Sequence, residues 1–97
     1  MKVERFHSNN QFVIYDVGYY NKSINENETV FGSMFQSYNF NIAFIGNDGQ
    51  VYLDKRFWDY SRTTGKYRNL FLSETKKETE KKITSGEYIL INLNIGG

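Results

Sequence analysis

The fold is decided by the stretch from Met34 to Ile45, which reads MFQSYNFNIAFI. One face of this stretch carries Met34, Tyr38, Phe40, Ile42 and Phe44, with Gln36 as its single polar interruption. The other face carries Ser37, Asn39, Asn41 and Ala43. Alternation with a period of two is typical of a strand that buries one face. We therefore predict one strand over residues 34–45.

The chain on either side of this stretch predicts further strands. Gly46-Asn47-Asp48-Gly49 is a tight turn, because Asn, Asp and Gly tolerate positive φ. Residues 50–58 then return as the paired strand. Upstream, residues 2–7 and 11–17 predict a hairpin, because the break between them is polar turn chemistry. Residues 21–29 are almost entirely polar, and we expect an exposed loop there.

Beyond residue 59 the spacing of apolar residues becomes helical. The i, i+3 and i+4 positions are occupied by Tyr67, Leu70 and Phe71. Candidate caps for the start of this helix are Ser61, Thr63 and Thr64. The capping-box pattern from Thr75 to Glu78 predicts a second short helix, and Gly86 is a good stop for it. Residues 87–95 are apolar on both faces, which is typical of a central or covered strand.

These elements predict an α+β fold: a small antiparallel sheet of about five strands, with one or two short helices before the last strand. The composition agrees, because 8 Phe and 8 Tyr stand against a single alanine and no proline. A chain of 97 residues fits one domain, which we place at residues 1–97. The net charge of +1 indicates neither a strongly basic nucleic-acid-binding domain nor an acidic mimic of DNA.

Few residues offer catalytic or metal chemistry. His7 is the single histidine, and the absence of cysteine excludes disulfides and thiolate metal sites. A carboxylate pair for glycoside hydrolysis would come from Asp48, Asp54 and Asp59. Asp48 lies in the turn, and the odd spacing of the other two puts them on opposite faces of a strand. We expect no enzyme, no cofactor, no metal site and no membrane span, since no apolar run approaches the roughly 20 residues that a span needs.

The run Thr63-Thr64-Gly65-Lys66 contains a Gly-Lys pair but is no phosphate loop. That motif requires a glycine five residues before the pair, where this chain has Tyr60. A helix N-terminus nevertheless attracts anions through its free N–H groups. Arg62 and Lys66 would share a face with Asn69, and Arg68 is nearby. This arrangement fits an anion, a phosphate or an acidic partner, and it equally fits ordinary capping beside a solvated basic face.

Aromatic residues near these cations allow a second interpretation. Tyrosine and tryptophan rings occur at positions 52, 58, 60 and 67, beside arginines at 56, 62 and 68. They resemble a stacking platform for unpaired bases, a protein-binding hot spot rich in Trp, Tyr and Arg, or simply part of the core. The candidate binding residues are Arg56, Trp58, Tyr60, Arg62, Thr63, Thr64, Lys66, Arg68, Tyr19 and Tyr20, the last two as the best candidates for exposed rings.

The run Tyr-Ser-x-Thr-Thr-x-Lys-Tyr over residues 60–67 is the most specific of several runs that resemble a family of small tailed-bacteriophage proteins, a domain of unknown function. The resemblance covers residues 31–94. Further matching runs are Phe35-Gln36-Ser37-Tyr38-Asn39, Lys66-Tyr67-Arg68-Asn69 and Ser85-Gly86-Glu87-Tyr88. The resemblance implies a phage origin and a place in the cytoplasm of an infected host bacterium.

Two functions remain open at this point. The first is a non-enzymatic binding protein that inhibits or modulates a host or anti-phage-defence protein by direct contact. The second is a nucleic-acid-binding accessory protein of phage replication or expression, which would show salt-sensitive binding to single strands. An enzymatic function has the least support, and the sequence does not decide between a monomer and a homodimer.

Overall fold

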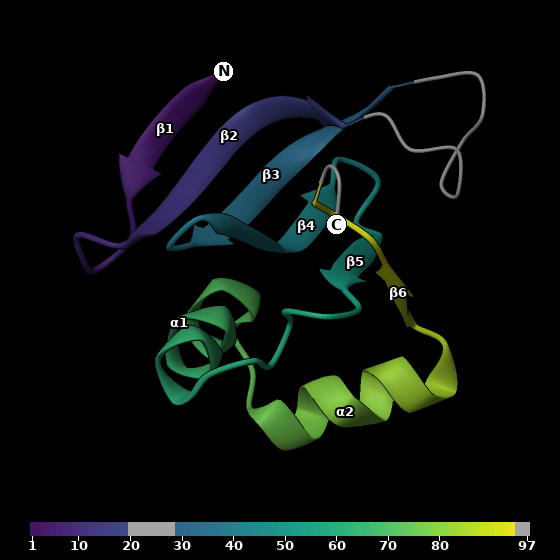
Figure 1. The fold of residues 1–97 in the computed structure, drawn as a ribbon. Helices are drawn as coiled ribbons and strands as arrows, with labels where there is room; N and C mark the ends of the chain where they lie inside the picture. The colour runs from purple at the N-terminus through teal and green to yellow at the C-terminus, as the bar shows by residue number, and fades with distance from the viewer. Residues whose placement is uncertain (20–28, 95–97) are drawn as a thin grey trace.

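The computed structural model describes residues 1–19 and 29–94, and within them it confirms the α+β class (Figure 1). The strands are β1 (Lys2–Arg5), β2 (Gln11–Tyr19), β3 (Val30–Ser37), β4 (Phe40–Gly46), β5 (Val51–Asp54) and β6 (Tyr88–Ile91). The helices are α1 (Arg62–Leu72) and α2 (Lys76–Ser85). The described residues form one sheet of six strands rather than about five, in the order β1-β2-β3-β4-β5-β6. Neighbours are antiparallel except β5 and β6, which are parallel because the two helices connect them.

The prediction of a single strand over residues 34–45 is wrong. The chain turns at Tyr38 and Asn39, and the two halves pair with each other as β3 and β4. Tyr38 takes a left-handed conformation with φ 55°, and its N–H donates to the carbonyl oxygen of Asn10 at 2.7 Å. This bond ties the turn to the β1–β2 turn. The two-residue turn pairs Ser37 with Phe40 and so changes the parity of the pattern. The β-bulge between Phe35 and Gln36 restores the parity, so that Met34 pairs with Phe44 and the alternation hides the turn.

The return strand over residues 50–58 is also shorter than predicted, since β5 ends at Asp54. The buried carboxylate of Asp54 accepts hydrogen bonds from the backbone N–H groups of Arg56 and Phe57, at 3.0 and 2.8 Å. Its other oxygen accepts from the N–H of Leu93 at 2.8 Å and from the side chain of Asn94 at 3.0 Å. Asp54 thus bends the chain out of the sheet and holds the C-terminal segment beside it.

Other local predictions are confirmed. The first hairpin forms between β1 and β2, and residues 46–49 turn the chain between β4 and β5. Ser61 caps α1, because its hydroxyl oxygen accepts from the N–H of Thr64 at 3.1 Å. Thr75 and Glu78 form the capping box of α2, which ends at Gly86 with φ 84°. Most of the polar loop predicted over residues 21–29 lies outside the described residues.

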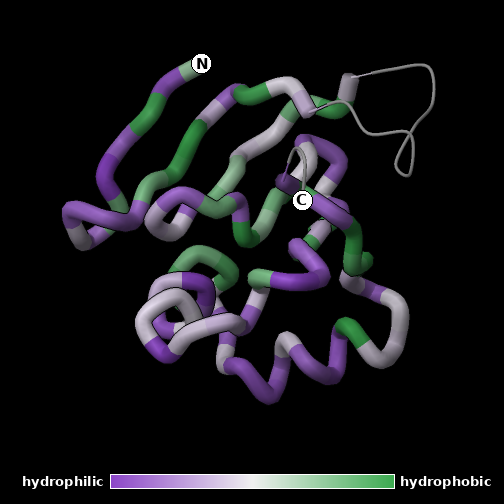
Figure 2. The backbone as a smooth tube through the Cα atoms, viewed as in Figure 1, coloured by the Kyte–Doolittle hydropathy of each residue, from purple (hydrophilic) through white to green (hydrophobic). Residues whose placement is uncertain are grey.

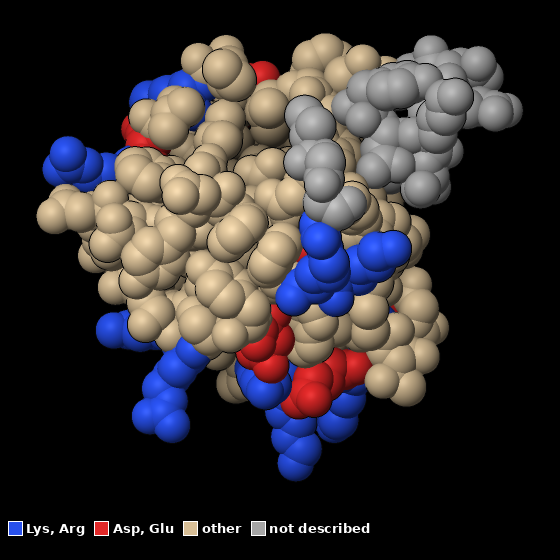
Figure 3. Space-filling view, viewed as in Figure 1, with Lys and Arg blue, Asp and Glu red and all other residues tan. Residues whose placement is uncertain are grey.

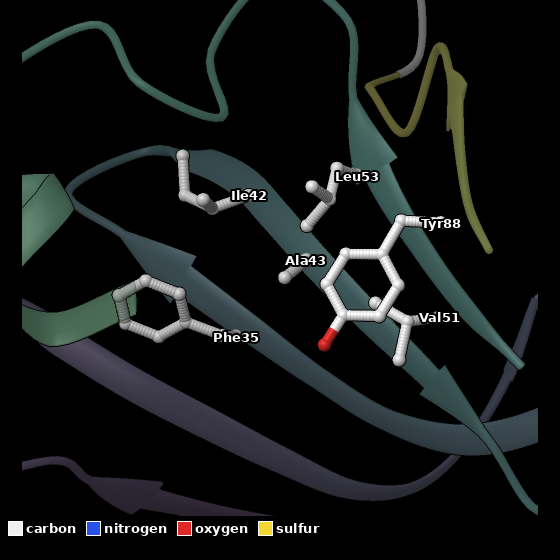
Figure 4. Packing of buried hydrophobic residues seen from close by; sticks show 6 residues of the cluster. All are labelled: Phe35, Ile42, Ala43, Val51, Leu53 and Tyr88. Atoms are coloured by element: carbon white, nitrogen blue, oxygen red, sulfur yellow. The ribbon is translucent and has the colours of Figure 1, made fainter. Parts of the chain in front are cut away.

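The sheet buries apolar residues on both faces. Figure 2 shows hydrophobic residues recurring along its strands. The helix-covered face carries a cluster of Phe35, Ile42, Ala43, Val51, Leu53 and Tyr88 (Figure 4). Tyr67 and Phe71 of α1 and Ile83 of α2 pack against this cluster. The opposite face carries a second cluster, which consists of Met34, Phe44, Tyr52, Ile91 and Leu93.

The last strand was predicted to be central or covered. It is an edge strand, so the central alternative is wrong, but α2 packs against it, which agrees with the covered alternative. Tyr88 and Ile91 are buried in the clusters on opposite faces of the sheet, while Ile89 and Leu90 are exposed. Neither helix within the described residues is long and apolar enough to cross a membrane.

Candidate functional site

Residues 55–61 connect the sheet to α1 and fix the position of the predicted binding stretch. The N–H of Trp58 donates to the carbonyl oxygen of Asp54 at 3.0 Å, and the half-buried Trp58 side chain packs against the helix-covered cluster. Trp58 is therefore part of the core boundary. Two residues later the chain reaches Tyr60, which is 40% exposed, and then the cap Ser61.

Arg68 lies in the interior and not on the predicted basic face. Its side chain is fully buried, and its guanidinium lies 5.1 Å from the centre of the Trp58 ring. Nη1 donates to the carbonyl oxygen of Trp58 at 2.6 Å and to Asp59 Oδ1 at 3.0 Å, while Nη2 donates to Asn69 Oδ1 at 3.0 Å. Arg68 thus joins α1 to the preceding turn.

Asp59 is shared between Arg68 and the first residue of α2. Its second carboxylate oxygen lies 2.7 Å from Lys76 Nζ. Burial raises the pKa of Asp59, but hydrogen bonds and charge from Lys76 and Arg68 outweigh it and leave the pKa below its ordinary value. The carboxylate is therefore charged at neutral pH, and it links Arg68 in the middle of α1 to Lys76 at the start of α2.

Thr64 is also internal, because its hydroxyl lies 2.7 Å from the hydroxyl of Ser37 on β3 and both residues are fully buried. Thr63 is exposed. Leu70 was predicted to share the packed face of α1 with Tyr67 and Phe71, but it is exposed instead. The packed face of α1 is therefore narrower than the apolar spacing indicates, and it includes Thr64 and the Arg68 side chain.

The surface above this internal network is hollowed into a groove of about 710 Å³. Its lining residues are Asp59, Tyr60, Ser61, Arg62, Gly65, Lys66, Arg68, Asn69, Leu70 and Lys76. Within the described part of the chain, neither Arg62 nor Lys66 forms an ion pair with a carboxylate. Lysine and arginine side chains project around the helices in the view of Figure 3. The groove is therefore cationic, and Asp59 at its edge is neutralised by its own partners.

An aromatic patch, which we define as Phe40, Phe57 and Tyr60, adjoins the groove through Tyr60. The rings of Phe40 and Phe57 are stacked, with centroids 4.1 Å apart and an interplanar angle of 16°. Tyr60 stands edge-on to both at 5.8 and 5.7 Å. The guanidinium of Arg56 lies 5.0 Å from the Phe57 ring centre. Arg56 and Tyr60 of the predicted set are thus brought together with two phenylalanines that were not predicted.

The predicted stacking platform does not form. Tyr52 is buried in the cluster on the opposite face of the sheet, and the ring of Tyr67 packs against the helix-covered cluster. Tyr19 belongs to the opposite face as well, where its ring lies 5.7 Å from Phe44 and its hydroxyl donates to the carbonyl oxygen of Asn92 at 2.8 Å. Tyr20 lies outside the described residues.

Sequence reasoning missed Phe40, Phe57 and Lys76 as surface candidates. The alternating pattern assigned Phe40 to the buried face, although it is 37% exposed. Lys76 reaches the groove from α2, and no local pattern links it to Asp59. Among the described residues there is no group of three or more His, Cys, Asp or Glu side chains that could hold a metal ion.

The chain matches the family of unknown function DUF8033 over residues 1–87, and it therefore belongs to that family. The match includes the β1–β2 hairpin, which the resemblance over residues 31–94 left out. No curated protein and no solved structure matches the chain.

Proposed function

We propose that this member of DUF8033 is a phage-encoded, non-enzymatic binding protein that modulates a host or anti-phage-defence protein by direct contact in the host cytoplasm. The observation that carries the proposal is the aromatic patch beside Arg56 and the cationic groove. Protein-binding hot spots are enriched in Tyr, Trp and Arg, and they combine an apolar centre with a polar rim. Here the three rings supply the centre, and Arg56 and the groove supply the rim.

The arrangement of the rings favours a protein over single-stranded nucleic acid. A stacking platform needs ring faces that are free to receive bases. Phe57 is stacked on Phe40 and has a guanidinium over its ring, and the Trp58 ring is covered by Arg68. What the surface offers instead is a preformed ring cluster, which loses little conformational entropy when a partner binds.

The proposal is tested by affinity purification of the tagged protein from host cells. We expect one stoichiometric protein partner, and we expect the variants Phe40→Ala and Tyr60→Ala to lose it. Tyr15→Ala is a matched control, because Tyr15 on β2 lies outside the patch and, like Phe40, is 37% exposed. Circular dichroism checks that each variant remains folded.

Retention of the partner by both patch variants would refute the proposal. Recovery of nucleic acid alone would favour the accessory-protein hypothesis. In that case binding to single strands should weaken steeply with salt, because phosphate contacts release counterions. Arg62 and Lys66 would then be the residues to test, since both line the groove without an ion-pair partner among the described residues.

A further inference from the structure

Gly65 in α1 has no explanation in the fold. Glycine is the least favourable helix residue after proline. Gly65 is buried, its φ is not positive, and a Cβ atom added to Gly65 would meet no atom closer than 3.6 Å. An alanine therefore fits at this position and should improve the helix. The lack of a side chain leaves room at the floor of the groove.

The ion pair of the buried Arg68 with Asp59 lies next to this floor. The two atoms nearest to the Cβ position are Nη2 of Arg68 and Oδ1 of Asp59, each at 3.6 Å. Arg68 is fully buried, and among the described residues its Nε has no hydrogen-bond partner. Buried polar groups are nearly always paired, so this unpaired Nε is unusual. Arg62, Lys66 and Lys76 add three more cations to the same lining.

We propose that the groove over Gly65 binds an acidic peptide segment of the partner protein, an inference that rests on the proposed function. Carboxylates of the segment would lie among Arg62, Lys66 and Lys76, where charge-assisted hydrogen bonds are strongest. The groove has the size of sites that hold whole small ligands, so a single carboxylate leaves it largely empty. Tyr60 and the exposed Leu70 line the same groove and fit an apolar side chain within the acidic segment.

Fluorescence anisotropy with defined probes tests this inference on the full chain. The first probe is a fluorescein-labelled peptide of the sequence Glu-Glu-Glu-Leu-Glu-Glu, and the second has glutamine at every glutamate position. An oligothymidylate with the same charge as the first probe is the third. Of the three probes, we expect only the glutamate peptide to bind at about 0.15 M salt. This salt concentration screens weak attraction between distant exposed charges, so binding that persists there depends on close contacts.

The most informative variant is Gly65→Ala. We expect an unchanged or higher melting temperature together with about tenfold weaker peptide binding, because the added methyl group takes up space at the floor of the groove, against Arg68 and Asp59. A merely structural role for Gly65 predicts no such loss. The double variant Arg62→Gln/Lys66→Gln should also weaken binding about tenfold, as expected for two exposed charges.

The matched control is Lys77→Gln/Lys81→Gln, which removes the same charge from exposed positions of α2 outside the groove lining. We expect its affinity to stay within about twofold. Unchanged binding in Gly65→Ala, an equal loss in the control, or tighter binding of the oligothymidylate would each overturn the inference. If Gly65→Ala retains a captured partner that Phe40→Ala and Tyr60→Ala lose, the groove inference fails and the proposed function stands.

Discussion

Asp54→Asn is the substitution that most directly tests how the stretch after β5 is held. The Asp54 carboxylate accepts two hydrogen bonds on each oxygen, one pair from the N–H groups of Arg56 and Phe57 and the other from Leu93 and Asn94. Asparagine has nearly the same shape but replaces one acceptor oxygen by an NH₂ group. Whichever way the amide turns, two donors lose their acceptor and face another donor.

The expected loss follows from those two donors. An unsatisfied buried donor costs about 1–3 kcal/mol. Because three of the four bonds are only part-buried, we expect the free energy of unfolding to fall by about 2–4 kcal/mol. A domain of this size has a stability of about 5–15 kcal/mol, so the variant should still fold. Its melting temperature should fall by at least about 10 °C.

Urea denaturation followed by circular dichroism measures this loss. Asp48→Asn is the matched control, because Asp48 is exposed in the β4–β5 turn and accepts one hydrogen bond, from the N–H of Gln50 at 3.0 Å. Asparagine serves equally well in such a turn, so the control should change stability by less than about 0.5 kcal/mol. A loss below about 1 kcal/mol for Asp54→Asn, or equal losses for the two variants, would refute the reasoning.

Three further predictions use the same denaturation assay. Arg68→Met should lower the free energy of unfolding by about 3 kcal/mol, because it removes a buried guanidinium that is hydrogen-bonded to Trp58 and Asp59. The control Arg62→Met, at the exposed rim of the groove, should change the free energy of unfolding by less than about 0.5 kcal/mol. Gln11→Met should stabilise the protein by about 1 kcal/mol, because both amide atoms of the fully buried Gln11 lack a hydrogen-bond partner among the described residues. A loss of stability in this variant would show that the amide is paired. Burial raises the pKa of Glu74, but hydrogen bonds from Lys82, Thr79 and Tyr88 outweigh burial and leave the pKa below its ordinary value of about 4.5. The stability that the Glu74 carboxylate contributes is therefore present above that pH and is lost as the pH falls below it. Glu74→Gln should flatten this acid limb of the stability curve, and an equally steep limb would contradict the assignment.

The sequence predicted the features that depend on neighbouring residues. Ser61, the Thr75–Glu78 box and Gly86 were found because capping is a local interaction between residues within one helical turn. The turn at residues 46–49 was found for the same reason, since the residues that tolerate its geometry are the ones present.

Features set by distant contacts were missed. The turn at Tyr38 and Asn39 contains no glycine, and it is held by a hydrogen bond that the N–H of Tyr38 donates to the carbonyl oxygen of Asn10 on another hairpin. The alternating pattern continues across this turn without a break, and it therefore placed Phe40 in the core. Arg68 was predicted to be a binding residue because it lies near Arg62 and Lys66 in the sequence, but it is fully buried. Its burial depends on the carbonyl oxygen of Trp58 and the carboxylate of Asp59, whose positions follow from the turn after β5.

The stretch from Trp58 to Leu72 therefore separates into two sets of residues with different roles. Trp58, Thr64 and Arg68 are buried or half-buried and hold α1 to the sheet, so substitutions there change stability and binding together. Tyr60 and Lys66 are exposed, and no cluster of the core depends on them. A substitution at an exposed residue without a structural role leaves the stability of the fold unchanged. A loss of binding in such a variant can therefore be attributed to recognition. Binding defects confined to the exposed set, with melting temperatures unchanged, would separate recognition from stability within one helix and its preceding turn.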